Sequence, residues 1–347
     1  MPTPTFSELM RRYLDERTGQ FLAIEDGVQE RIEEALAAAA DYMDRLVLRA
    51  SERGLVSAER LMETRRAIER TIKDFGGLAG DAIKDGRRAA SIEGATGMMS
   101  AARAAAEVLD IGLDWRASTV TISRDAIDYI ARYPLGGMPL SQRVWQVTDD
   151  TVRAVFGRLN SGIIGGEGAQ TIARDIRQHL LDPKGQARLS GQLKGLRTRA
   201  RAAQRAQDYE RAARLFASAS EKEKLLAPVG RGVYRSAHQN AMRVARSELL
   251  RAHQGGAYRY GERKRWVVGY RWQPNVAACE ICKAMEGEYS HSSAPDYPHP
   301  NCGCRLEVVS DFDAEGKKFQ DAPLDVKGEE RRLYFAAQAR QELKKAA

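Results

Sequence analysis

The chain has 347 residues, of which 43% are hydrophobic and 29% charged, a composition that excludes wholesale disorder. Its length fits roughly two domains. The 55 Lys and Arg residues against 47 Asp and Glu give a net charge of +8, which permits contact with a polyanion but does not require it.

The sequence also limits the location of the chain and its fold class. The N-terminal residues lack a signal-peptide pattern, and the longest apolar run, around Ala35–Ala40, is too short to span a bilayer. We therefore expect a chain that is neither secreted nor inserted in a membrane. Aromatic residues are only 7% of the chain and alanine is abundant, which favours helix. The expected fold is mainly α, with elongated helical N-terminal and middle regions and a small α+β zinc-binding module near the C-terminus.

The first region, residues 1–113, is expected to be a helical docking or arm region. Apolar residues recur there at three- and four-residue spacing. We predict three helices, over residues 31–52, 57–75 and 78–109. Gly76-Gly77 should end the second helix, and Gly86 and Gly94 should interrupt the third.

The middle region, residues 114–230, is expected to hold further helices. A short helix is predicted from Ser123 to Arg132. Thr148 is predicted to be an N-cap, followed by acidic residues that suit the first turn of a helix. The Gly-rich segment 162–168 should then form a tight turn between two helices. It is not predicted to bind phosphate, because it lacks the Lys-Ser or Lys-Thr ending and follows a helix.

A basic connector, residues 184–214, lies within the middle region. It contains nine Lys and Arg residues against two acids. It is either a solvated segment or a contact for the backbone of double-stranded DNA, which would be non-specific and salt-sensitive. No interleaved aromatic residues favour base stacking. The candidates for phosphate contact are Lys194, Arg197, Arg199, Arg201 and Arg205.

The third region, residues 231–310, begins with a helix predicted from Arg231 to Gly255. Glu248 falls at the edge of its apolar stripe, with Arg251 three residues on. Either Glu248 and Arg251 form a surface ion pair of small value, or Arg246 and Glu248 serve as a structural brace from this helix to the cysteines beyond it. Residues 311–347 are expected to be a C-terminal tail with a helix.

All four cysteines of the chain fall in one short stretch of the third region, together with a histidine. We call this set the Cys/His cluster: Cys279, Cys282, His299, Cys302 and Cys304. A Cys-x-x-Cys pair, a spacer and a second set of Cys/His ligands are typical of structural zinc sites. Flanking strands, Trp266–Trp272 and Leu306–Val309, are expected to pair across the cluster.

Five candidates compete for the four positions of a tetrahedral site. We expect Cys279, Cys282 and Cys302 to bind, with His299 and Cys304 competing for the fourth position and His291 a weaker candidate. The alternatives are two disulfides, unligated thiols and a redox Cys-x-x-Cys, although no βαβ context supports the last. In a reducing cytosol, metal binding is the commoner use of clustered thiols.

Three motifs together resemble the phage head morphogenesis family, the Mu F-like minor head proteins. The resemblance covers about residues 130–310. It is carried by Leu140-Ser141-Gln142-Arg143 before the Gly-rich turn, by Ala245-Arg246-Ser247-Glu248, and by Trp272, Cys279, Cys282, Gly287 and His299-Pro300-Asn301-Cys302. The chain departs from the family at Gly303, where an arginine is usual, and Arg305 follows two places later.

The resemblance implies a non-enzymatic virion component with structural zinc. Such proteins associate with the portal and other head components, enter the head during assembly in the host cytoplasm, and influence DNA packaging or ejection. Two other classes stay open. A zinc-braced nuclease of the His-Asn-His type would have to use His291 or His299, and a zinc-dependent DNA-binding protein would show sequence preference.

Overall fold

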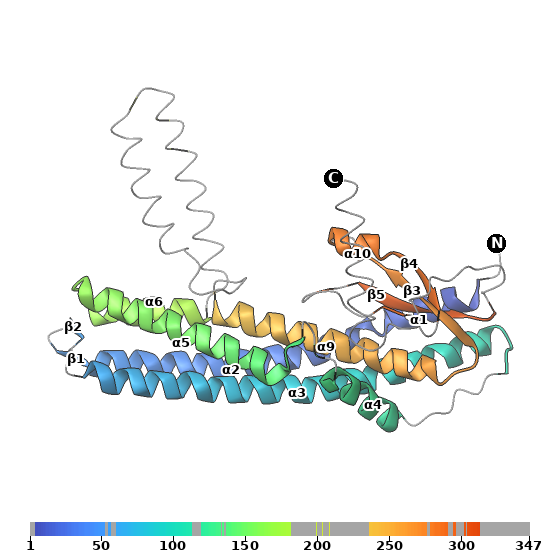
Figure 1. Ribbon diagram of the computed structural model, residues 1–347, viewed down its shortest axis with the longest axis horizontal. Coiled ribbons are helices and arrows are strands. Elements are labelled where there is room, and N and C mark those ends of the chain that lie inside the picture. Colours follow the sequence, from blue (N-terminus) through green and yellow to red (C-terminus); the bar gives the residue numbers. More distant parts are fainter. Residues whose placement is uncertain are drawn as a thin grey trace. The chain divides into compact units, whose positions relative to one another are not determined.

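The computed structural model describes most of the chain, and all structural statements below concern these residues. The described positions are 4–52, 55–56, 60–112, 119–132, 134, 137–181, 199, 203, 208, 236–275, 278–290, 294–295, 302 and 304–312. The chain is mainly helical with one small antiparallel sheet near its C-terminal end (Figure 1), which confirms the expected mainly α fold with a small α+β module. Among the described helices, none combines the length and the apolar character that a membrane crossing needs.

The chain divides into two compact units, each built from segments far apart in the sequence. The sheet unit comprises Met1–Gln29, Ala82–Leu140 and Arg243–Ala347, and the helical unit comprises Glu30–Asp81 and Ser141–Met242. Three long helices contribute residues to both units: α2 (Thr18–Arg49), α3 (Leu61–Val108) and α9 (Ala237–Glu262).

The helical unit is built from α2, α3, α5 (Leu140–Ile164) and α6 (Ala169–Leu181). A hairpin of β1 (Ser51–Glu52) and β2 (Leu55–Val56) connects α2 to α3. The apolar stripe that the periodicity predicts along α2 is confirmed at six buried positions, whereas its seventh member, Leu46, is partly exposed. The buried members are Ile32, Leu36, Ala39, Ala40, Met43 and Val47. The predicted turn between α5 and α6 is also confirmed, with Gly166 at a φ of 66°.

The sheet unit combines helices with three antiparallel strands in the order β4-β3-β5. The strands are β3 (Val267–Gln273), β4 (Gly287–Ser290) and β5 (Arg305–Ser310). The predicted pairing of the two flanking strands is confirmed, with Tyr270 opposite Val308 and Trp272 opposite Leu306. The sequence analysis missed β4. It also missed α1 (Phe6–Glu16), which opens with a capping box of Thr5 and Glu8 and buries Phe6 against Trp266. The remaining helices are α4 (Thr119–Arg132) and α10 (Glu280–Ala284).

The predicted helix stops at glycine are wrong. Helix α3 runs unbroken through Gly76, Gly77, Gly86 and Gly94, and α9 continues past Gly255 and Gly256 to Glu262. For Gly86 and Gly94 the physical reason is close packing between helices of the sheet unit, whereas nothing lies within 4 Å of a Cβ on Gly77. A Cβ atom on Gly94 would lie 1.8 Å from the backbone oxygen of His253. Several of these glycines therefore give room to a neighbouring helix and do not end their own.

The predicted N-cap at Thr148 is also wrong, because α5 begins at Leu140. Thr148 lies inside the helix, where its hydroxyl donates a hydrogen bond of 2.9 Å to the Val144 carbonyl. A threonine can satisfy its hydroxyl this way in a helix interior, so the local capping rule was not decisive. Helix α2 likewise begins at Thr18, thirteen residues before the predicted start at Arg31.

The glycine at the helix contact should be intolerant of any side chain. We expect Gly94→Ala to lower the free energy of unfolding by about 1–3 kcal/mol, because the added methyl group would overlap the backbone of α9. Gly77→Ala is the matched control, since nothing lies within 4 Å of its added Cβ on the same helix. We expect the control to raise stability by about 0.5–1 kcal/mol. Urea denaturation of both variants measures the difference, and equal effects would contradict the packing argument.

Candidate metal centre

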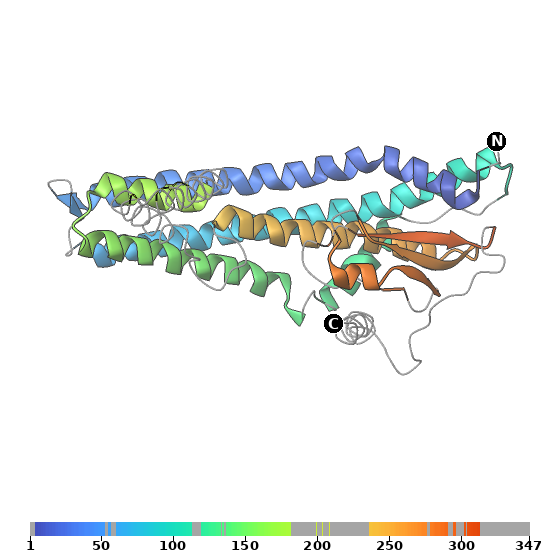
Figure 2. The same cartoon turned by 90° about the horizontal axis from the view of Figure 1, so that it is seen from above.

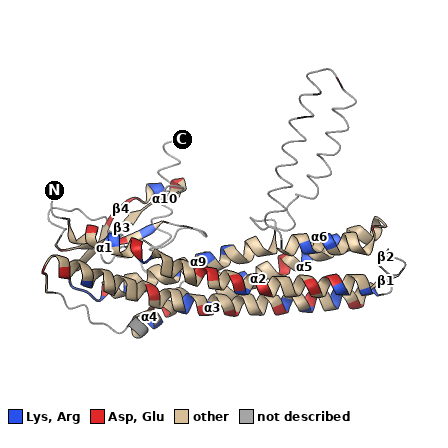
Figure 3. Ribbon diagram, turned by 180° about the vertical axis from the view of Figure 1, so that it is seen from behind, with Lys and Arg blue, Asp and Glu red and all other residues tan. Residues whose placement is uncertain are grey.

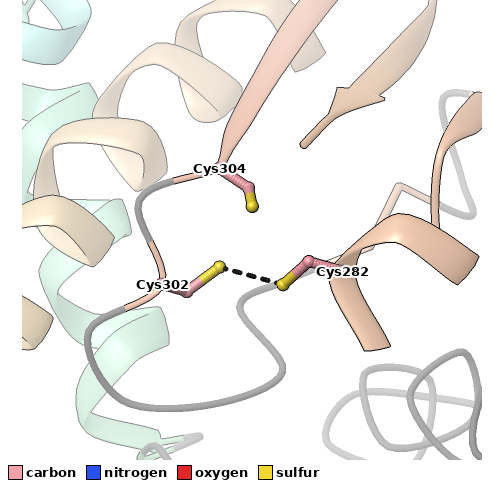
Figure 4. A group of neighbouring side chains, drawn as sticks. All are labelled: Cys282, Cys302 and Cys304. Atoms are coloured by element: carbon pink, nitrogen blue, oxygen red, sulfur yellow. Dashed lines mark hydrogen bonds between the residues drawn. The ribbon is translucent and has the colours of Figure 1, made fainter. Parts of the chain in front are cut away.

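Three thiols converge in the sheet unit and define what we call the thiol cluster: Cys282, Cys302 and Cys304. Their sulfur atoms all lie within 4.8 Å of one another, and the Cys282 and Cys302 sulfurs are 3.4 Å apart. Figure 4 shows the three side chains directed toward a common point. All three are buried, and none of the four cysteines of the chain is in a disulfide, so the disulfide alternative is not formed.

Local structure explains why these thiols meet. Cys282 lies on the short helix α10, whereas Cys302 and Cys304 lie on the segment that enters β5. Successive residues of an extended chain point to opposite sides, so two cysteines separated by one residue face the same way. The large side chains Trp272, Met285 and Tyr289 pack around the three thiols. They shield the cluster from water.

The cluster has the dimensions of a metal site. Zinc–sulfur bonds of about 2.3 Å in a tetrahedron would place the sulfurs roughly 3.8 Å apart, within the observed range. Burial raises the pKa of the Cys304 thiol, and the neighbouring Cys282 adds to this rise, although a backbone hydrogen bond from Asn275 opposes it. Three thiolates in an apolar setting need a cation to stabilise their charge. A buried group of this composition can hold a metal ion.

The structure places the other predicted ligands differently. Cys279 is described but lies outside the thiol cluster, at the N-cap position of α10 with an exposed side chain. Cys304, expected only as a competitor for the fourth position, takes part in the cluster instead. His299 and His291 lie outside the described residues.

A glutamine that the sequence analysis missed connects the thiol cluster to helix α9. The side-chain amide of Gln254 donates a hydrogen bond of 3.0 Å to the backbone oxygen of Cys304. This contact fixes the segment that carries two of the three thiols. No sequence pattern identified Gln254, because the bond depends on packing between residues 50 positions apart.

Arg246 and Glu248 were expected to connect their helix to the Cys/His cluster, but the structure pairs both of them with residues of other helices. Glu248 is only 3% exposed, and its carboxylate pairs with Arg87 of α3, with 3.3 Å between the Arg87 Nε and Glu248 Oε2 atoms. Burial lowers the pKa of Arg87, the Glu248 carboxylate opposes this, and the nearby Arg251 adds to it. Arg246 is half-exposed and pairs with Glu25 of α2. Both residues therefore connect α9 to other helices.

Of the five candidates for DNA contact, the structure describes one. Lys194, Arg197, Arg201 and Arg205 lie outside the described residues. Arg199 is described, and its side chain is exposed on a helical residue.

Comparison with protein-family models, with curated proteins and with solved structures found no match to this chain.

Removing a ligand from the thiol cluster should release the metal and destabilise the sheet unit. We expect Cys282→Ser to lose about one bound metal ion per chain. The free energy of unfolding should fall by about 2.7 kcal/mol or more, the linkage energy of a ligand present at roughly 100 times its Kd. Lys283→Ala is the control, because it changes an exposed side chain on the same helix as Cys282, and it should retain the metal. Elemental analysis and thermal unfolding measure both effects, and unchanged metal content in Cys282→Ser would rule the site out.

The two ion pairs that α9 forms with other helices should contribute very different amounts to the free energy of unfolding. We expect Glu248→Ala to lower the free energy of unfolding by about 3–5 kcal/mol, because it leaves the buried Arg87 charge without its carboxylate. Arg246→Ala removes a half-exposed pair and should cost less than about 1 kcal/mol. Denaturant titration of the two variants makes the comparison. Similar losses in both would contradict a buried ion pair between α9 and α3.

Proposed function

We propose that this chain is a structural minor head protein of a tailed phage, associated with the portal during head morphogenesis. The observation that carries the proposal is the joining of two motifs of the resemblance in one folded unit. The helix with the Ala-Arg-Ser-Glu sequence is bonded to the cysteine segment through Gln254 and Cys304. A chain that shares these motifs only by chance would have no reason to pack them together.

The proposed metal is zinc, in a structural role. Three soft thiolate ligands suit zinc among the common biological metals. His299 and Cys279 are the candidates for the fourth position. A site with four protein ligands has no open position for water, so the metal would hold the segment that enters β5 against α10 and take no part in chemistry. The protein is thus proposed to be non-enzymatic.

The proposed location is the inside of the head at the portal vertex, reached from the host cytoplasm during assembly. Long helices with exposed charged faces suit docking on portal and other head components. Influence on DNA packaging or ejection would act through the basic connector, where Arg199 is exposed. Such a contact would engage the phosphate backbone without sequence preference.

The proposal is tested by co-expression with the portal protein of the same phage. We expect the tagged portal protein to co-purify this chain at a fixed ratio, and Cys282→Ser to abolish the association because the sheet unit loses its metal. Arg246→Ala, on the same unit, should retain it. Absence of co-purification, or of this chain from assembled heads, would contradict the proposal. Plasmid cleavage with Mg²⁺ or Mn²⁺ that His291→Ala abolishes would favour the nuclease class instead.

A further inference from the structure

Helices α2 and α3 of the helical unit run side by side (Figures 1 and 2) and enclose an elongated groove with a volume of about 440 Å³. Each helix contributes residues at three- and four-residue spacing, so the groove follows one face of both helices. The lining residues are Ala35, Ala38, Ala39 and Tyr42 on α2, and Ala67, Arg70, Thr71, Asp74, Phe75 and Leu78 on α3. All of them belong to the helical unit.

The groove is apolar at its floor and carries large exposed apolar side chains at its rim. Ala35, Ala39, Ala67 and Phe75 form the buried floor. At the rim, Leu78 is 60% exposed and Tyr42 is 42% exposed. The Thr71 hydroxyl is already hydrogen-bonded, because it donates to the Ala67 carbonyl oxygen at 2.9 Å. The groove therefore offers both a hollow and a protruding apolar side chain.

Two opposite charges lie in the same groove, one helical turn apart on α3. Within the described part of the chain, neither Arg70 nor Asp74 forms an ion pair. The neighbouring residues Glu69 and Lys73 are paired, with 2.8 Å between their charged atoms, so the helix does use such pairs elsewhere. Figure 3 shows charges of both signs along α2 and α3. Arg70 and Asp74 are thus available to an external partner with the reverse order of charges.

We propose that this groove binds a second copy of the same chain around a two-fold axis. A two-fold axis near residues 72 and 73 would run the two α3 helices antiparallel and place Arg70 opposite the partner's Asp74. The same axis would place the exposed Leu78 level with the partner's Arg66, beside Ala67 at the hollow of the groove. A patch with both charges and both a knob and a hollow is self-complementary, as a two-fold interface requires.

Symmetry makes each of these contacts occur twice. The two Arg–Asp pairs would fix the register of the antiparallel helices, and the two leucines would bury the apolar rim. Any partner of single charge would leave either Arg70 or Asp74 opposed by a like charge. The proposal goes beyond the proposed function, since it concerns only how copies of this chain associate.

The test is the molar mass of the full chain in solution, measured by sedimentation equilibrium. We expect a dimer whose dissociation constant rises at least about tenfold in Arg70→Glu and in Asp74→Arg, equivalent to about 1.4 kcal/mol. The double variant Arg70→Glu/Asp74→Arg again places opposite charges across the interface. Its dissociation constant should therefore return to near the original value. Leu78→Asp should dissociate the dimer. Glu69→Lys, a charge reversal on the same helix outside the groove, should leave it unchanged.

Three results would overturn the proposal. They are a monomer at every concentration up to the solubility limit, a dimer that none of the groove variants weakens, and a double variant that stays as weak as the single ones. Circular dichroism melting of each variant separates dissociation from unfolding, because the substituted side chains are exposed. The measurement involves no portal protein, so its failure leaves the proposed function intact, and the reverse also holds.

Discussion

The sheet unit depends on the close approach of α3 and α9 at two glycines. A Cβ on Gly94 would lie 1.8 Å from the backbone oxygen of His253, and one on Gly256 would lie 2.0 Å from that of Ser91. Backbones can approach this closely only where no side chain intervenes. The contact sets the positions of the polar groups along α9, because it places Glu248 against Arg87 and leaves Gln254 able to reach Cys304. One steric constraint thus positions both the buried ion pair and the thiol cluster.

This constraint also explains which parts of the fold the sequence could predict. The apolar stripe of α2 and the pairing of β3 with β5 follow from periodicity and residue type, and both were predicted correctly. The glycines were misinterpreted because an isolated glycine favours a helix end. Its use in packing depends on a second helix some 160 residues further along the chain. Local rules contain no information about that neighbour, and the same holds for the Arg87 partner of Glu248.

Local sequence rules also predict only part of the thiol cluster. Two-residue spacing predicts that Cys279 and Cys282 lie near each other, and alternation in an extended chain predicts that Cys302 and Cys304 face one way. The second rule agrees with the structure, which brings both residues into the cluster. The first rule does not decide which thiol turns inward. Cys279 takes the N-cap position of α10 and is exposed, whereas Cys282 lies one turn later on the buried face of that helix.

Charge is distributed unevenly along the chain. Most of the excess positive charge lies in the basic connector, residues 184–214, and the rest of the chain is nearly balanced. Many arginines of both units are paired with acids of the same unit, as Arg17 is with Glu93 and Arg158 with Asp175. The basic connector, residues 184–214, holds nine basic residues against two acids, which accounts for nearly all of the net charge of +8. The rest of the chain is therefore close to neutral and suits contacts between proteins, where matched charges set register. Any long-range attraction to nucleic acid would then arise mainly from the connector, and salt would weaken it.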